Sequence, residues 1–176
     1  MKLNETVVAL LTLMLLGGCN HSKQPQSKAI ELEQLEERNG FAYKVDDPDP
    51  YTGKVVEFYE DGQKRSELNY VDGKQLGKQE GWLRNGHKTH EANFVIANGK
   101  LHEKYETWYK NGQKRSEKNF VDRKPHGKLE KWYENGQKML EENYVDGKPH
   151  GKKIVWAENG NILKDVNYVD GVQVAR

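Results

Sequence analysis

The sequence predicts an all-β fold: a single-layer antiparallel sheet of about five tandem β-hairpins that forms an open, solenoid-like ribbon. The 176 residues are only 35% hydrophobic and 31% charged, which leaves little apolar material for a thick two-layer core. Short segments that mix aromatic and β-branched residues with charges recur along the chain. Between them, an Asn-Gly or Asp-Gly pair returns at intervals of 24, 26, 24 and 24 residues, which is enough chain for two short strands and two turns.

Residues 1–18 are expected to be an export signal. A polar head is followed by an apolar stretch over residues 7–16, about half of the ~20 residues that span a bilayer. Leu16-Gly17-Gly18-Cys19 resembles the lipobox of bacterial lipoproteins, which implies cleavage before Cys19 and acylation of its thiol and new amino group, palmitate included. The alternative is a soluble secreted protein whose single Cys lies near the cleavage site.

The same resemblance indicates where the protein is held. Asn20 rather than Asp after the cysteine implies transport to the outer membrane, with the folded body facing the periplasm of a bacterial cell envelope. Several acyl chains, at roughly 0.8 kcal/mol per buried CH₂, form a firm anchor.

Residues 19–52 are expected to connect this anchor to the repeats. Residues 19–38 read as a polar tether followed by a possible short helix, since the Glu-rich composition of 29–38 favours helix while its apolar residues fit neither a helical stripe nor a strand. Residues 39–52 look like a degenerate half-repeat that caps the array.

Residues 53–176 contain five copies of one unit, in which residues of the same kind return at the same intervals. The turn pairs are Asp61-Gly62, Asn85-Gly86, Asn111-Gly112, Asn135-Gly136 and Asn159-Gly160. The aromatic residues before them are Phe58, Trp82, Trp108, Trp132 and Trp156. We therefore expect one β-hairpin in each copy.

Within a copy, Asn-Gly predicts a two-residue turn in which both residues have positive φ. In the fourth copy such a turn would place Trp132 opposite Met139. Neither face is then fully apolar, so we expect a sheet wetted on both sides and held by aromatic ladders. Strand alternation gives one face with Trp132, Glu130, Met139, Glu141 and Asn143, and another with Tyr133, Leu129, Leu140 and Tyr144.

The connection between hairpins is expected to be a longer loop. Residues 146–152 hold two glycines and a proline, which cannot donate to a strand ladder. The second copy carries two extra residues within 95–99, and we expect this insertion in the loop as well. The tail Val172-Gln173-Val174 is expected to close the far end of the sheet.

The repeat unit resembles a known family. Residues 132–138, Trp-Tyr-Glu-Asn-Gly-Gln-Lys, and the following 144–152 are similar to the bacterial variant of the MORN repeat. Residues 37–56 look like the start of YwqK-family antitoxins. The resemblance covers about residues 37–171; it implies a hairpin sheet, and association with toxins in some members. The chain departs from the pattern at Glu103 and Arg123, where most copies have Gly, at Ala157 in the Tyr position, and at Asn161-Ile162, where Gln-Lys stands.

The sequence predicts no catalytic residue, no enzymatic activity and no cofactor, because it lacks a Gly-x-Ser-x-Gly elbow, a phosphate loop and a His-Glu-x-x-His helix. His102, His126 and His150 recur once per copy, roughly 9.6 Å apart, whereas zinc needs its ligands about 2.0 Å away. We therefore expect histidines that cap turns, and no metal site. The recurring carboxylates are expected to form salt bridges with lysines: Glu67, Glu91, Glu117, Glu141 and Asp165.

Two surface features are candidates for binding. Repeated aromatic residues pack between repeats, and exposed indoles also form platforms for sugars or a partner chain. Repeated lysines protect a sheet from aggregation, and they also suit anionic lipid headgroups or an acidic protein. The predicted binding face consists of Phe58, Trp82, Trp108, Trp132, Trp156, Tyr109 and Tyr133, and the predicted basic edge of Lys78, Lys104, Lys128, Lys152, Lys124 and Lys148.

These features favour a non-catalytic envelope lipoprotein that binds a protein partner, and the resemblance to YwqK-family antitoxins implies that the partner is a toxin and this chain its immunity protein. The alternative is a module for carbohydrate, cell wall or anionic lipid that uses the aromatic ladder and the lysines. The net charge of +1 gives no reason to expect nucleic-acid binding.

Overall fold

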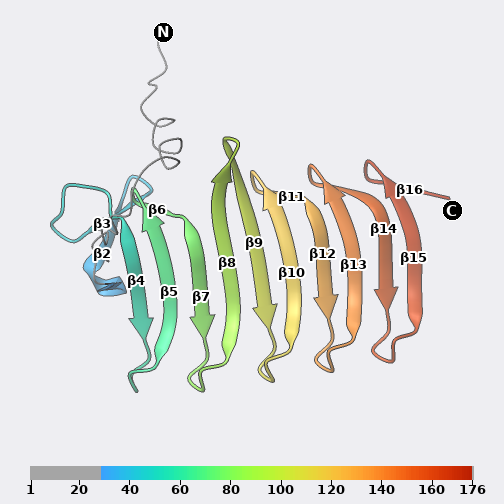
Figure 1. The fold of residues 1–176 in the computed structure, drawn as a ribbon, viewed down its shortest axis with the longest axis horizontal. Helices are drawn as coiled ribbons and strands as arrows, with labels where there is room; N and C mark the ends of the chain where they lie inside the picture. Colours follow the sequence, from blue (N-terminus) through green and yellow to red (C-terminus); the bar gives the residue numbers. More distant parts are fainter. Residues whose placement is uncertain (1–28, 176) are drawn as a thin grey trace, which may run out of the picture.

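The computed structural model describes residues 29–175, which form one long open sheet with a small cap at its N-terminal end (Figure 1). The five expected hairpins are present in this range and lie side by side in chain order, so the all-β, single-layer prediction is confirmed. The hairpins are β4 (Gly53–Phe58) with β5 (Lys64–Val71), β7 (Gly77–Trp82) with β8 (Lys88–Ala97), β9 (Lys100–Trp108) with β10 (Lys114–Val121), β12 (Gly127–Trp132) with β13 (Lys138–Val145), and β14 (Lys148–Trp156) with β15 (Ile162–Val169). Short strands extend the sheet: β6 (Lys74–Gln75), β11 (Lys124–Pro125) and β16 (Val172–Val174).

The cap adds a second layer that the sequence did not predict. It consists of β1 (Ile30–Glu31), a 3-10 helix η2 (Leu32–Gln34), β2 (Leu35–Arg38) and β3 (Phe41–Lys44). Residues 29–38 are therefore strands and one 3-10 turn, not the possible α-helix. β1 pairs parallel with β4, and β2 pairs with β3 as a separate two-stranded sheet.

This cap encloses the one cluster of buried apolar residues found in the described range. The cluster contains Ile30, Ala42, Val55 and Tyr70, and Val55 is only 1% exposed. Backbone hydrogen bonds fix the cap to the first inter-hairpin turn, from the Ala42 N–H to the Gly73 carbonyl at 2.8 Å and from the Gly73 N–H to the Tyr51 carbonyl at 2.9 Å. The sheet of hairpins is thus a single layer except at this end, where the cap covers one face and a buried cluster lies between the two.

The two kinds of turn are exchanged relative to the prediction. The connection at Asp146-Gly147 is a tight two-residue turn, because both residues have positive φ, 48° and 85°, and Val145 pairs directly with Lys148. This conformation matches the twist of paired strands. The long loop expected over 146–152 is therefore wrong, since β14 begins at Lys148.

The Asn-Gly end has a wider turn. The Gly136 N–H donates to the Tyr133 carbonyl at 2.9 Å, and only the glycine of the pair has positive φ. This is the geometry of a four-residue turn closed by a glycine bulge. Trp132 consequently lies opposite Lys138 instead of Met139, and Tyr133 lies in the turn.

The connection between the second and third hairpins, from β8 to β9, forms the longest stretch of paired strands in the described sheet. Its two extra residues lengthen the strands and not the loop, so β8 and β9 pair without interruption up to Ala97 and Lys100, and the hairpin rises above its neighbours in Figure 1. In two other hairpins a glycine with positive φ breaks the strand at this point, namely Gly77 and Gly127. Glu103 occupies that position here, in regular strand.

At the far end, β16 pairs with β15 and forms the last strand of the described sheet. This matches the expectation for the Val172–Val174 tail. No helix within residues 29–175 has the length and apolar character needed to cross a membrane. The expected signal, Cys19 and the first part of the tether lie outside the described residues.

Candidate binding site

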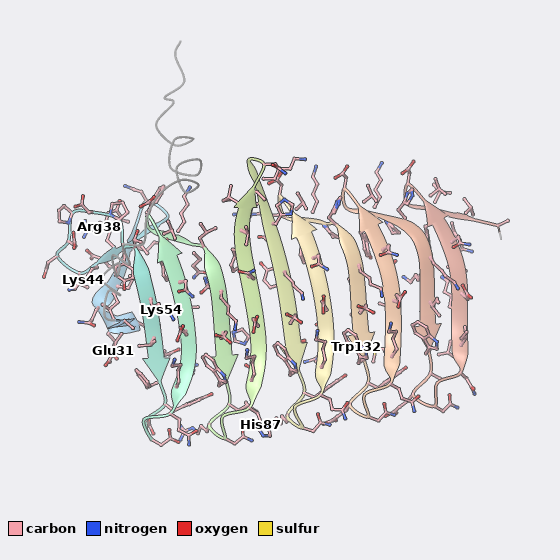
Figure 2. All side chains as sticks on the ribbon, in the orientation of Figure 1. Glu31, Arg38, Lys44, Lys54, His87 and Trp132 are labelled. Atoms are coloured by element: carbon pink, nitrogen blue, oxygen red, sulfur yellow. The ribbon has the colours of Figure 1, made fainter. Side chains whose placement is uncertain are left out.

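The sheet has two faces with different chemistry. We call the face that carries Trp82, Trp108, Trp132 and Trp156 the tryptophan face, and the opposite one, which carries Phe94, Glu103 and Phe120, the groove face. Figure 2 shows side chains standing off the sheet along its whole length, with Trp132 toward the end where His87 and the Asn-Gly turns lie.

A row of carboxylates crosses the tryptophan face. Glu106 lies directly opposite Glu91 on one side and Glu117 on the other, because the register is conserved from hairpin to hairpin. Seven glutamates of the described strands are joined in this way, and the row is Glu67, Glu80, Glu91, Glu106, Glu117, Glu130 and Glu141.

Lysines bind this row from both sides. The Lys114 Nζ lies 2.5 Å from Glu106 Oε1 and 2.7 Å from Glu117 Oε2, and the Lys104 Nζ approaches the same two carboxylates at 3.4 and 3.1 Å. The same four-residue arrangement holds for Lys78 with Lys88 and for Lys128 with Lys138; Lys152 lies 3.5 Å from Asp165. The salt bridges expected of the recurring carboxylates are present. Four lysines of the predicted basic edge are therefore neutralised locally: Lys78, Lys104, Lys128 and Lys152.

The ion pairs shift the pKa values of both partners. Burial raises the pKa of Glu106, but hydrogen bonds from Lys114 and Lys104 and their charges outweigh burial and hold it below its ordinary value. For Lys114, burial lowers the pKa and the contacts with Glu106 and Glu117 raise it to a larger extent. The net shifts favour the charged form of each group.

The indole rings are covered by the same lysines. Lys88 Nζ lies 5.5 Å from the ring centroid of Trp108, one hairpin further along, and Lys114 lies 5.6 Å from that of Trp132. These are cation–π distances. Lys64 over Trp82 and Lys138 over Trp156 repeat the contact, and all four tryptophans are half-buried. Phe58, at the same position of the first hairpin, is 45% exposed.

The tyrosines of the predicted binding face join neighbouring hairpins. The Tyr109 hydroxyl donates to the Trp132 carbonyl at 2.8 Å, and the Tyr133 hydroxyl donates to the Trp156 carbonyl at 2.9 Å. On the tryptophan face, neighbouring hairpins are thus joined to one another by ring contacts, ion pairs and tyrosine hydroxyls.

The remaining lysines of the predicted basic edge, Lys124 and Lys148, follow the inter-hairpin turns Asp122-Arg123 and Asp146-Gly147 and are exposed. Histidines lie at the same end: His150 Nδ1 is 3.4 Å from Asp170 Oδ1, and His126 Nδ1 is 3.8 Å from Asp146 Oδ1. Within residues 29–175, no three His, Cys, Asp or Glu side chains gather in a way that could hold a metal ion.

The groove face is hollowed beyond the cap. A groove of about 700 Å³ runs over β8, β9 and β10. Its floor is an aromatic triad in which Tyr105 makes edge-to-face contacts with Phe94 and Phe120, at centroid distances of 5.7 and 5.6 Å. Gln75, Glu103, Thr107, Ser116, Lys118 and Arg123 complete the lining.

Glu103 and Arg123 flank this triad. Glu103 pairs with Phe94 on one side and with Phe120 on the other, and it is 8% exposed. Burial raises the pKa of Tyr105, the negative charge of Glu103 raises it further, and Arg123 lowers it. The sequence singled out both residues as departures from the repeat, but their meeting in one groove depends on strand register, which no single copy specifies.

The comparison with protein families identifies the repeat. The MORN repeat variant matches residues 51–72, 101–122, 125–146 and 149–170, which together make up half of the chain. The chain belongs to the MORN repeat variant family. No curated protein matches the sequence.

Membership indicates a repeat-based binding module, since MORN repeats are generally binding elements without catalytic function. The hairpin of β7 and β8 lies outside the matched segments but has the same fold and register as its neighbours. Its strand β8 supplies Phe94 to the floor of the groove, so the hairpin outside the matched segments helps to build the candidate site.

Proposed function

We propose that this protein is a non-catalytic lipoprotein of the bacterial envelope that binds a partner protein through the groove face of its sheet. One observation carries the proposal. The rings and charges of the tryptophan face are occupied by one another, whereas the groove face offers an aromatic triad in an open hollow. Aromatic side chains in a concave, accessible patch are the groups that dominate protein interfaces.

The finer assignment is that of an immunity protein held at the outer membrane by acylated Cys19. It is supported by the lipobox-like segment and by the resemblance of residues 37–56 to YwqK-family antitoxins. A sheet built to bind without catalysis suits a protein that neutralises a toxin by occupying its surface.

Site-specific photocrosslinking in living cells tests this proposal. A photoreactive amino acid replaces Lys118, which lines the groove, and in a matched control it replaces Lys128, an exposed residue of the tryptophan face. We expect one protein adduct from position 118 and none from position 128. Adducts from both positions alike, or from neither, would refute the use of the groove face.

The immunity assignment is tested with the crosslinked partner. Its expression in the periplasm should stop growth of cells that lack this chain, and co-expression of the acylated chain should restore it. A partner that is harmless when expressed alone would refute the immunity role while leaving the binding role in place.

The alternative is a cell-wall or carbohydrate module that uses the tryptophan row. Its support is the repeated spacing of the indoles, but each ring already carries a lysine on one side. If this alternative were correct, sedimentation with purified peptidoglycan would be lost in a folded Trp108→Ala, Trp132→Ala variant. We expect sedimentation to be the same for the variant and the parent chain.

A further inference from the structure

The groove is the place where the repeat pattern is broken twice. Gly77, Gly127 and Gly151 occupy the position of Glu103 in other hairpins, and Gly occupies the position of Arg123 in every other inter-hairpin turn. Arg123 keeps the positive φ of that turn, 63°, which is unfavourable for a residue with a side chain. Both charged residues line the same groove. Two departures that converge on one site suggest selection for a ligand rather than drift.

Glu103 differs from the other buried polar residues of the described range. Gln79, 4% exposed, exchanges hydrogen bonds with the Asn69 backbone at 3.0 and 2.9 Å. Glu142, also 4% exposed, lies 3.0 Å from the Lys153 ammonium. Glu103 is 8% exposed as a residue, its carboxylate lines the open groove, and within residues 29–175 that carboxylate forms no hydrogen bond or ion pair. Because this carboxylate has no partner within the described residues, a ligand that supplies a positive charge or hydrogen-bond donors can pair with it in the groove.

The surroundings of Glu103 define the group that fits. Phe94 and Phe120 lie directly across from it on the neighbouring strands, and Tyr105 touches both rings. A carboxylate among aromatic rings suits a cation with an apolar stem, since the charge pairs with the carboxylate while the stem and the cation pack on the rings. Arginine and lysine side chains have this form.

The rim of the groove carries the opposite charge. Lys118 and Arg123 line it without occupying Glu103. A bound segment is therefore complementary when an acidic residue stands near its basic one.

Resting on the proposed function, we propose that the groove binds an arginine or lysine side chain of the partner protein against Glu103, within a segment whose neighbouring acidic residue meets Lys118 and Arg123. This assigns the partner's chemistry at a single subsite. The rest of the groove face then contributes area and shape.

Selection from a random peptide library displayed on phage tests this inference with the acylation-free chain, residues 20–176, as bait. We expect the selected peptides to share an Arg or Lys with an Asp or Glu nearby. Replacement of that Arg by citrulline, which keeps its shape and removes its charge, should weaken binding to the parent chain at least tenfold.

The variant Glu103→Gln closes the test. The affinity of the unmodified peptide for this variant should be at least tenfold lower than for the parent chain. The citrulline peptide should bind the parent chain and the variant with the same affinity. The matched control Glu142→Gln changes a buried carboxylate of the same face outside the groove, and it should bind as the parent does. Circular dichroism confirms that both variants fold.

The outcomes separate this inference from the proposed function. Selected peptides that contact the groove without a basic residue, or that bind Glu103→Gln unchanged, would overturn the inference and leave protein binding intact. The absence of any selected peptide would count against both. Peptidoglycan binding that is lost in Tyr105→Ala but retained in Glu103→Gln would assign the groove to a glycan and overturn the inference.

Discussion

Glutamates that face each other across a strand pair repel, and the carboxylate row places such pairs in succession across the sheet. Like charges directly opposite one another are destabilising. The row is stable because each glutamate pair within a hairpin lies between two lysines, as Glu106 and Glu117 lie between Lys104 and Lys114. A single lysine therefore has more effect here than an isolated surface charge usually has.

The variant Lys114→Met should lower the free energy of unfolding by about 1 kcal/mol. It removes the shorter pair of contacts to Glu106 and Glu117 and uncovers one side of Trp132. Urea denaturation followed by tryptophan fluorescence measures the change. Lys124→Met, at an exposed position beside a turn, is the matched control and should change stability by less than about 0.5 kcal/mol. Equal effects of the two variants would contradict the role of the row.

The carboxylate row also predicts how stability depends on pH. The pKa values of Glu80, Glu106 and Glu130 are lowered in the folded state, so these groups stabilise the fold above their ordinary value of 4.5. That contribution is lost as the pH falls below 4.5 and through the folded pKa values. Urea midpoints should be constant near neutrality and fall as the pH drops below 4.5. A urea midpoint that rises toward low pH would contradict the lowered pKa values of these glutamates in the folded state.

At the scale of the element, the hairpin turns show what sequence alone could predict. Five hairpins and their spacing follow from the repeats, since each Asn-Gly pair stands between two strand-like segments. The turn type does not, because Asn-Gly fits both a two-residue turn and a wider turn with a glycine bulge. In the wider turn Lys138 lies opposite Trp132, and its ammonium reaches Glu130 and Glu141 on the two strands of the same hairpin, a contact that the turn sequence alone does not specify.

The groove illustrates the same limit at the level of a site. Glu103 and Arg123 are visible in the sequence as exceptions, 20 positions apart. They meet because β8 and β9 continue without a bulge, which brings Glu103 level with Phe120 on β10. A sequence pattern predicts which residues form each strand. It does not predict the register of β8, β9 and β10, and that register places the groove residues next to one another.

Glycines at equivalent turn positions should respond differently to the same substitution. Gly73→Ala should cost about 2 to 4 kcal/mol, because a Cβ there would lie 2.9 Å from the Ala42 carbonyl oxygen and 3.0 Å from the Phe41 Cβ, in addition to the strain of φ +73°. Gly171→Ala, with φ +88° and its nearest contact at 3.8 Å, is the matched control and should cost about 1 kcal/mol. Thermal unfolding compares the two; equal costs would show that the cap does not depend on this turn.

At the scale of the whole molecule, stability is divided unevenly along the ribbon. The cap and the first hairpin share a buried cluster, whereas the later hairpins are held by ion pairs, ring contacts and backbone ladders that connect nearest neighbours. Substitutions in the cluster should therefore loosen one end and leave the distant hairpins in place.

The variant Val55→Ala should test this division. Val55 is 1% exposed, and its truncation should cost about 2 kcal/mol. Amide hydrogen exchange should increase in the cap and in β4 and β5, and stay unchanged in β12 to β15. Val155→Ala, on the same face of the last hairpin, is the control and should leave the cap protected. Uniform acceleration along the chain would indicate one cooperative unit instead.

The last hairpin has consequences for how such an array lengthens during evolution. Ala157 has no hydroxyl to donate where Tyr109 and Tyr133 have one, and Ile162 stands where a lysine would lie over the next indole. A duplicated unit added after this hairpin would therefore receive neither a tyrosine hydroxyl bond to its backbone nor a lysine over its indole ring. A copy inserted among the inner hairpins would keep both contacts, whereas a copy added after the last hairpin would have only backbone pairing.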